Sequence, residues 1–321
     1  MKNSVFKAMR AVCFLVCLAL LLAAASYMLA PKDNTAESGI NNPNANGFFS
    51  EPEDSIDIAV IGNSDAYSGF SPMELWNKYG YTSYVSGEGS QTVAQAYAML
   101  KKILSCQTPK VVILETDGFF TKSKLIQNAA YIINTSLGSS FSVFQYHDRW
   151  KRVKPEELFK KPEYTAHCAT KGQMLSNDVR GYMGGEYMVK TDAKAKLSLA
   201  TKTTLDAFVK LCRSNNIELI FVEMPSQSSW NYKKHNGVKA YADKHDIPFL
   251  DLNLDRDRFD FDWKTDTRDR GNHLNSRGAR KTTLFIGEYL KENYSLTDYR
   301  KHSGYAQWHK DYEEYLSEVN I

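Results

Sequence analysis

Two residues that lie far apart in the sequence could form a nucleophile and its base. Ser64 follows an apolar run, and His273 precedes the last long helix-like segment. A serine hydroxyl is a weak nucleophile unless a neighbouring base, usually histidine, takes its proton, and that histidine needs a carboxylate to orient it. Asp269 lies four residues before His273 and Asp266 seven before. We favour Asp269 as the orienting acid and keep Asp266 as the alternative.

The same chemistry needs hydrogen-bond donors for the oxyanion that develops at the substrate carbonyl. Glycine turns can present backbone N–H groups to an oxyanion without a side chain in the way. We therefore expect an oxyanion hole made by the Ser64 N–H and by Gly87 or Gly89. Further polar residues are placed to support the site, with Asn63 and Asp65 shaping the turn and Asn275 tying the histidine loop to the following helix. The residues in this supporting set are Asn63, Asp65, Asp117 and Asn275.

The candidate site residues lie at the ends of predicted strands and helices, and the order of these strands and helices predicts a parallel α/β sheet. Short apolar runs typical of buried strands alternate with helical segments, which favours a three-layer α/β/α sandwich. In such sheets ligands bind outside the carboxyl ends of the strands. Ser64 follows the first run, Gly87 and Gly89 the second, and His273 precedes the last helix, so we expect them to meet at that edge. The predicted strands are residues 56–61, 82–85, 110–115, 218–222 and 248–252.

The rest of the chain divides into segments of different composition. We expect the α/β domain to occupy residues 51–292, with an aromatic, glycine-containing insertion at about 119–200. Residues 31–50 are rich in Asn, Pro, Gly and Ser and read as a flexible linker. An aromatic tail follows at 293–321.

The N-terminus predicts a membrane segment. An apolar run from Ala11 to Ala30 follows Lys2, Lys7 and Arg10. It is long enough to cross a hydrocarbon core of about 30 Å, and the basic flank predicts a cytoplasmic N-terminus with the domain outside. We favour an uncleaved anchor over residues 1–30. A cleaved signal peptide is the alternative, and it would make the protein secreted.

Composition narrows the choice of partners. The net charge of the chain is only +3, and its Lys and Arg residues are scattered along the sequence. This pattern excludes a nucleic-acid partner. The spacing of Cys and His predicts no metal site, disulfide framework or cofactor.

Two motifs resemble a known family. Gly62-Asn63-Ser64-Asp65 after a first strand, and a late His273 before a terminal helix, resemble the SGNH/GDSL hydrolases. The stretches 64–72 and 273–279 look closest to membrane-anchored bacterial members related to the teichoic-acid D-alanine transfer protein and to alginate-type O-acetylation proteins. The resemblance covers about residues 55–290. It implies ester hydrolysis or acyl transfer on a cell-surface glycan or cell-wall polymer, with a membrane-bound O-acyltransferase as partner.

The chain departs from that family pattern at two positions. The family's acid stands three residues before the histidine, where this chain has Arg270. Its oxyanion asparagine follows the third strand, where this chain has Thr116-Asp117-Gly118. Losing one oxyanion donor costs roughly 10²–10³ in rate. The alternative is therefore a weak or inactive SGNH-like module that binds glycan or docks an O-acyltransferase.

Overall fold

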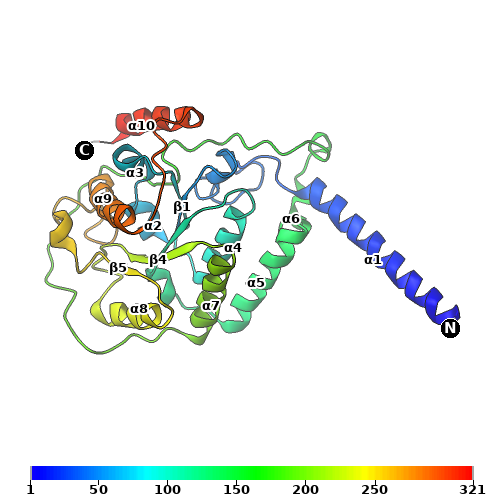
Figure 1. Ribbon diagram of the computed structural model, residues 1–321, viewed down its shortest axis with the longest axis horizontal. Coiled ribbons are helices and arrows are strands. Elements are labelled where there is room, and N and C mark those ends of the chain that lie inside the picture. Colours follow the sequence, from blue (N-terminus) through cyan, green and yellow to red (C-terminus); the bar gives the residue numbers. More distant parts are fainter. Residues whose placement is uncertain (1, 320–321) are drawn as a thin grey trace.

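The computed structural model describes residues 2–319 and is built on a five-stranded parallel sheet. The strand order is β2-β1-β3-β4-β5, and Gly62 at the end of β1 pairs with Gly87 at the end of β2. The predicted three-layer α/β/α fold is confirmed, because helices cover both faces of this sheet (Figure 1). The strands are β1 (Ile58–Gly62), β2 (Ser83–Gly87), β3 (Val111–Glu115), β4 (Glu218–Glu223) and β5 (Phe249–Asp251).

The helices fall between these strands and at both ends of the chain. The α-helices are α1 (Lys2–Leu29), α2 (Ser64–Gly69), α3 (Pro72–Tyr79), α4 (Val93–Ile103), α5 (Leu125–Ser140), α6 (Val143–Tyr146), α7 (Leu199–Ser214), α8 (Tyr232–Lys244), α9 (Ser276–Asn293) and α10 (Ala306–Glu318). The 3-10 helices are η1 (Gly47–Ser50), η2 (Asp117–Phe120), η3 (His147–Lys151), η4 (Pro155–Glu157), η5 (Arg256–Phe259) and η6 (Ser303–Tyr305).

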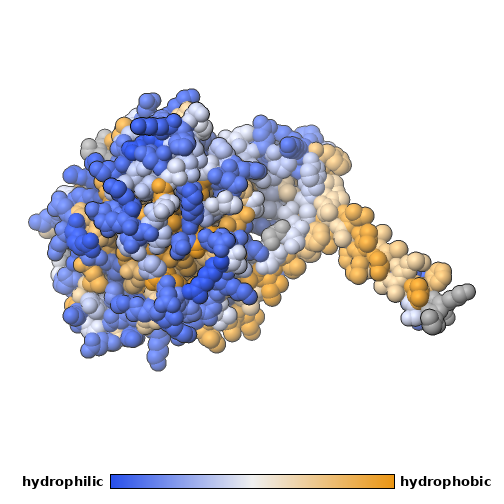
Figure 2. Space-filling view, viewed as in Figure 1, coloured by the Kyte–Doolittle hydropathy of each residue, from blue (hydrophilic) through white to orange (hydrophobic). Residues whose placement is uncertain are grey.

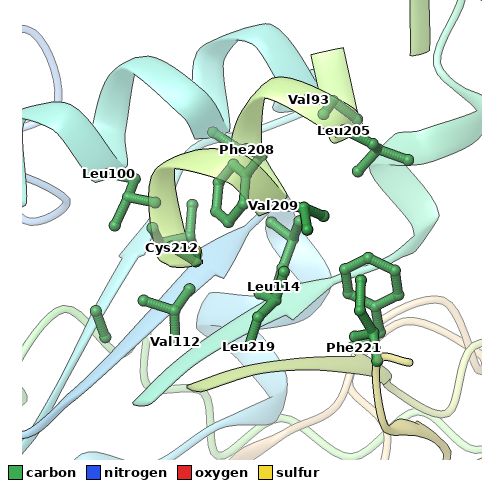
Figure 3. Packing of buried hydrophobic residues seen from close by; sticks show 14 of the residues in the cluster. Val93, Leu100, Val112, Leu114, Leu205, Phe208, Val209, Cys212, Leu219 and Phe221 are labelled. Carbon is green, nitrogen blue, oxygen red and sulfur yellow. The ribbon is translucent and has the colours of Figure 1, made fainter. Parts of the chain in front are cut away.

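Two hydrophobic cores lie on opposite faces of the sheet. Side chains alternate along each strand, so Ala59 and Ile61 of β1 enter one core and Ile58 and Val60 the other. The first core includes buried residues of α4, α7 and α8, and Figure 3 shows Phe208 of α7 among them. The second core lies under α2, α3 and α9. The apolar strand runs are explained by burial on both faces.

The expected flexible linker is instead packed against the domain. Lys32, Asn34 and Phe48 are buried. The Asn34 side chain donates to the Ala166 carbonyl and accepts from the Ala166 N–H, at 3.0 and 2.9 Å. Asp33 accepts two hydrogen bonds from Thr165. The prediction of a free linker at 31–50 is therefore wrong. Its polar side chains satisfy backbone groups of the insertion, which composition could not show.

The N-terminal helix stands apart from the sheet. Its portion Ser4–Leu29 contains an 18-residue stretch with a mean hydropathy of 2.6 and is long and apolar enough to cross a membrane, a property that anchors and signal sequences share. In Figure 1 α1 projects away from the domain, and only its C-terminal end meets α6.

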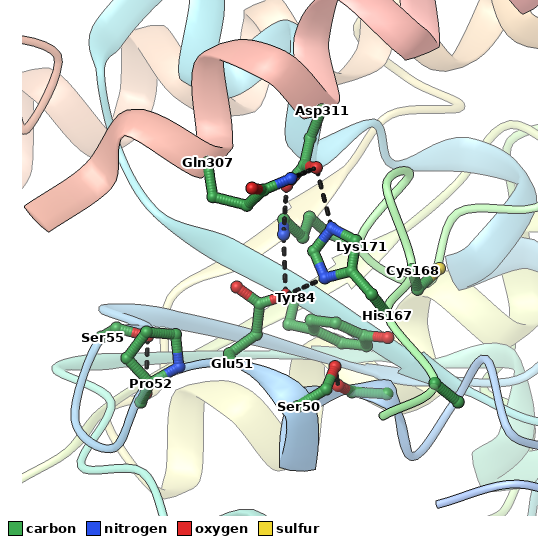
Figure 4. Close-up of polar contacts among 12 residues, drawn as sticks. Ser50, Glu51, Pro52, Ser55, Tyr84, His167, Cys168, Lys171, Gln307 and Asp311 are labelled. Carbon is green, nitrogen blue, oxygen red and sulfur yellow. Dashed lines mark hydrogen bonds and ion pairs between the residues drawn. The ribbon is translucent and has the colours of Figure 1, made fainter. Parts of the chain in front are cut away.

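A buried ion cluster joins the C-terminal helix to the domain (Figure 4). The Lys171 side chain is fully buried, and its ammonium group lies 2.7 Å from Glu51 and 2.6 Å from Asp311 of α10. His167 lies 2.7 Å from Asp311 through Nε2. The Lys171 ammonium also lies 4.7 Å from the centre of the Trp308 ring. The aromatic tail is therefore held in place by buried charge as well as by apolar packing.

Removing the cation of this cluster should destabilise the fold strongly. We expect Lys171→Met to lower the free energy of unfolding by about 3–5 kcal/mol, because two buried carboxylates would lose their partner. Denaturant unfolding of the full chain in detergent measures the change. Lys110→Met is the matched control. It removes a half-exposed ion pair with Asp57 and should cost less than about 1 kcal/mol. An equal, small effect of both changes would contradict the prediction.

Candidate active site

The structure brings Ser64, His273 and Asp269 into one chain of hydrogen bonds. Ser64 Oγ lies 2.9 Å from His273 Nε2, and His273 Nδ1 lies 2.5 Å from Asp269 Oδ2. With the Nδ1 proton donated to the carboxylate, Nε2 is left as the acceptor for the serine hydroxyl. Ser64 is partly exposed, so a substrate can reach its oxygen. This arrangement can remove the hydroxyl proton as the oxygen attacks a carbonyl.

Ser64 owes its position to the sharp change from strand to helix. β1 ends at Gly62, and Asn63 caps α2 by accepting a hydrogen bond of 2.7 Å from the Asp65 N–H. A side chain at Gly62 would collide with Glu115 and Ala66, so glycine is required there. The nucleophile candidate therefore lies at the first residue of α2, at the carboxyl edge of the sheet.

The loop before α9 explains how an acid four residues away reaches the histidine. Arg270 and Gly271 have positive φ angles of 68° and 87°, so the chain turns back on itself between Asp269 and His273. Asp269 Oδ1 then accepts hydrogen bonds from the backbone N–H groups of Asn272 and His273, at 3.1 and 2.7 Å. The turn directs the other carboxylate oxygen of Asp269 at the imidazole.

Asp266, the alternative acid, lies elsewhere in the described structure. It is fully buried and 2.8 Å from the Lys281 ammonium group, and it accepts from the Asp262 N–H. Asn275 caps α9 by accepting from the Gly278 N–H, and its amide donates to the Thr265 carbonyl. Both residues therefore shape the histidine loop.

Buried carboxyl groups surround the nucleophile turn and differ from Asp269 in ionisation. Burial, and then the nearby charge of Asp117, raises the pKa of Glu115 to about 8. Burial and neighbouring acids also raise the pKa values of Asp65 and Glu223 well above their ordinary range. Burial alone would raise the pKa of Asp269, but hydrogen bonds from His273 outweigh it and lower that pKa. At neutral pH the orienting acid is thus ionised, while Glu115 beside the nucleophile turn is mostly protonated.

Asp117 occupies the position after β3 and makes an ion pair. Its carboxylate lies 2.8 Å from the Lys234 ammonium group of α8 and accepts a hydrogen bond of 3.1 Å from the Asn63 side chain. Glu115 accepts from the N–H groups of Asn63 and Asp117. These contacts fix the nucleophile turn to the end of β3.

The two candidate oxyanion glycines have different surroundings. Gly87 lies against the nucleophile turn, since a Cβ there would stand 3.1 Å from both the Asn63 carbonyl and the Tyr67 ring. Gly89 is exposed, with open space where a Cβ would lie. Both line a cavity of about 410 Å³ that also contacts Tyr67, three residues after Ser64. Their backbones therefore border an opening next to Tyr67 of the nucleophile helix.

Sequence reasoning missed several residues that position the site. Lys234 holds Asp117, and Arg268 donates a hydrogen bond of 2.9 Å to Ser68 of α2, which ties the histidine loop to the nucleophile helix. The Asn272 amide lies 3.0 Å from His273 Nδ1. Arg268 and Asn272 could have been identified as site residues from their closeness to His273 in the sequence. Lys234 carries no such signal, because the polar sequence at 232–244 does not predict a helix.

Comparisons with known proteins find similar folds at low identity. No family model and no curated protein matches the sequence. The chain is similar to the structure of a lipolytic protein of the G-D-S-L family from Desulfitobacterium hafniense, with 15% identity, a TM-score of 0.41, and coverage of 72% of this chain and 97% of that one. It is also similar to a lipase/acylhydrolase from Enterococcus faecalis, with 12% identity, a TM-score of 0.40, and coverage of 75% and 99%.

A third similar structure is an acetyl xylan esterase from Butyrivibrio proteoclasticus. Its identity is 12% and its TM-score 0.34, with coverage of 75% of this chain and 64% of that one. Folds of one class host many activities, so an activity is assigned by the geometry of the site and not by the fold.

Proposed function

We propose that the protein is an extracytoplasmic, serine-dependent esterase or O-acyltransferase that forms an acyl-Ser64 intermediate. The observation that carries this proposal is the continuous hydrogen-bond chain from Ser64 Oγ through His273 to Asp269. A neutral imidazole that bridges a serine hydroxyl and an ionised carboxylate is the arrangement needed for nucleophilic acyl transfer.

The proposed reaction has two halves. Ser64 Oγ attacks the ester carbonyl while His273 Nε2 takes its proton, and the C–O bond to the leaving alcohol then breaks as His273 returns that proton to the alcohol. In the second half, water or a sugar hydroxyl gives its proton to His273 and attacks the acyl carbonyl. Ser64 leaves and is reprotonated. Water gives hydrolysis, and a sugar hydroxyl gives transfer.

Oxyanion stabilisation is assigned to the Ser64 N–H and a glycine N–H from Gly87 or Gly89. The Ser64 N–H lies at the start of α2 and Gly87 packs against the same turn. Asp117 stands where the resemblance would place an asparagine donor. Its carboxylate is occupied by Lys234 and Asn63. A site with fewer oxyanion donors should have a lower reaction rate. Each missing donor lowers the rate by roughly 10²–10³-fold.

The proposed substrate is an acylated, most simply acetylated, cell-surface polysaccharide or cell-wall polymer. The cavity lined by Gly87, Gly89 and Tyr67 supports a substrate with polar groups, because Asn42, Asn44 and Glu88 also line it. The long apolar α1 supports anchoring of the domain at the outer face of a membrane. A membrane-bound O-acyltransferase is the partner we propose as acyl donor, in line with the resemblance to membrane-anchored O-acetylation and D-alanine transfer proteins.

Active-site labelling tests this proposal. We expect a fluorophosphonate to label the full chain at Ser64, and Ser64→Ala to abolish the label. Incubating the wild-type chain with an acetylated oligosaccharide and a second, unacetylated sugar then separates the two reactions. Free acetate indicates an esterase, and acetyl on the second sugar indicates a transferase.

The missing oxyanion asparagine favours one alternative, a non-catalytic module that binds glycan or docks an acyltransferase. The geometry of Asp117 described above is the observation behind it. Absence of Ser64-dependent labelling, together with retained binding to the unmodified polysaccharide, would select this alternative over the enzyme.

A further inference from the structure

The insertion after β3 contains a helix whose surface is unusual for a water-exposed element. Residues 125–146, which include α5 and α6, contain no Asp, Glu, Lys or Arg. α5 packs on α4 and α7, so one of its sides faces the domain and the other is open. An exposed helix normally carries charged residues on its outer side.

The polarity of α5 is inverted relative to that rule. Ile126, Ala130, Ile133 and Leu137, spaced by four, three and four residues, share one side of the helix. We call this set the α5 stripe. It is exposed, with Ile126 at 83%, Ile133 at 58% and Leu137 at 44% of full accessibility. The opposite side faces inward and includes polar residues. There Asn128 is buried and hydrogen-bonds to Ser123 and Thr204.

The C-terminal end of α5 lies close to the point where the membrane-crossing candidate ends. The last turns of α1 are bonded to the segment after α5, since the Ser142 hydroxyl donates to the Ser26 carbonyl and the Val143 N–H to the Ser26 hydroxyl. Arg149 donates to the carbonyls of Leu29 and Ala30. In Figure 1 α1 and α5 diverge from this shared junction. In Figure 2 hydrophobic surface continues from α1 onto the domain edge along α5.

Aromatic and basic residues flank the stripe. Trp150 and Phe159 are exposed beyond its C-terminal end, and Tyr131 is exposed on α5 itself. Lysine and arginine residues bracket the uncharged segment on both sides, at Lys122, Lys124, Arg152 and Lys154. Aromatic rings and basic side chains around an apolar surface suit the headgroup region of a bilayer that contains anionic lipids.

We propose that the α5 stripe lies in the interfacial region of the bilayer that α1 crosses, so that the domain rests on the membrane surface by a second contact. This inference rests on the proposed anchoring by α1. A weak apolar contact suffices here, because the tether gives the stripe a high effective concentration at the lipid surface. This second contact fixes the orientation of the domain, and it therefore restricts how Ser64 is presented to a polymer at the membrane.

Cysteine accessibility in lipid vesicles tests the contact. Full-length Ile126→Cys and Leu316→Cys chains are reconstituted into vesicles of phosphatidylcholine and phosphatidylglycerol in equal amounts. They are treated with a charged, membrane-impermeant maleimide, and labelling is resolved by mass spectrometry and normalised to the unfolded chain. Leu316 is an exposed apolar residue of α10 with 48% accessibility. We expect residue 126 to react at least about tenfold more slowly than residue 316, although it is the more exposed in the protein.

A charge on the stripe provides the reverse test. Adding Ile133→Glu to the Ile126→Cys chain should restore labelling to the level at residue 316, because a carboxylate is costly in the apolar region. Adding Val189→Glu, a change at an exposed apolar residue outside α5, should leave residue 126 protected.

The outcomes separate this inference from the proposed anchoring, which alkaline carbonate extraction measures independently. Release of the chain by carbonate would overturn both. A chain that is retained but reacts at residue 126 as fast as at residue 316 would overturn only the α5 contact. Protection in native membranes but not in pure lipid vesicles would identify a membrane protein as the occupant and overturn the assignment to lipid.

Discussion

Ser64→Ala is expected to lower kcat/KM for an activated acetyl ester by about 10⁴–10⁶-fold. The change removes the oxygen that would form the acyl intermediate, and the imidazole and oxyanion donors that remain support only residual catalysis. Ester hydrolysis followed as 4-nitrophenol release from its acetate measures the loss. The fold should be unaffected, because Ser64 is partly exposed and the capping bond between Asn63 and Asp65 remains.

Ser68→Ala is the matched control for that substitution. Ser68 lies on the same short helix and is buried, where it accepts a hydrogen bond from Arg268. Because its hydroxyl contacts the loop and not the imidazole, activity should stay within about tenfold of the wild type. A Ser64→Ala chain that keeps a tenth or more of the wild-type rate would exclude Ser64 as nucleophile.

Asp269→Asn is expected to lower kcat by about 10⁴-fold while leaving the loop folded. The asparagine oxygen can still accept from the backbone N–H groups of Asn272 and His273. Its amide, however, faces His273 Nδ1 as a donor, so Nδ1 must become an acceptor and Nε2 must carry the proton. An Nε2–H cannot accept the Ser64 proton, and this inverted tautomer accounts for the loss.

Asp266→Asn distinguishes the two candidate acids. Asp266 is buried against Lys281, so its neutralisation should lower stability and leave kcat within about tenfold, provided that the protein is assayed well below its unfolding temperature. The reverse pattern, with Asp266→Asn inactive and Asp269→Asn active, would assign the orienting role to Asp266. Thermal unfolding measured beside the rate keeps loss of fold separate from loss of chemistry.

Much of the site was predictable because its chemistry follows strand ends. Ser64 directly follows β1, and the carboxyl ends of parallel strands meet at one edge, so its proximity to Gly87 followed from strand pattern alone. His273 was placed by its position before α9. The choice between Asp269 and Asp266 stayed open, because it depends on the positive φ angles of Arg270 and Gly271. Gly271 suits that conformation but Arg270 does not favour it, so residue type gave no sign that the turn includes residue 270.

Other parts of the fold were missed for reasons that are equally physical. α8, with the sequence Tyr232–Lys244, is polar apart from a few buried positions, so its hydrophobic periodicity is weak. Residues 31–50 have the composition of a linker, yet the amide side chain of Asn34 and the carboxylate of Asp33 pair with Ala166 and Thr165 of the insertion. Such pairings between distant segments leave no local pattern. The same holds for Lys171, whose burial between Glu51 and Asp311 joins three separate parts of the chain.

The sequence by itself determined the α/β class, the two candidate reacting residues and the long apolar N-terminal segment. These features depend on local pattern and on strand-end geometry, which a single chain displays directly. Only the tertiary structure decided which aspartate faces His273, which carboxyls are buried with raised pKa values, and which side of α5 is open. Those properties depend on the neighbours that each side chain meets after folding. Contacts between residues far apart in the sequence set the acid of the triad and the proposed membrane-facing surface.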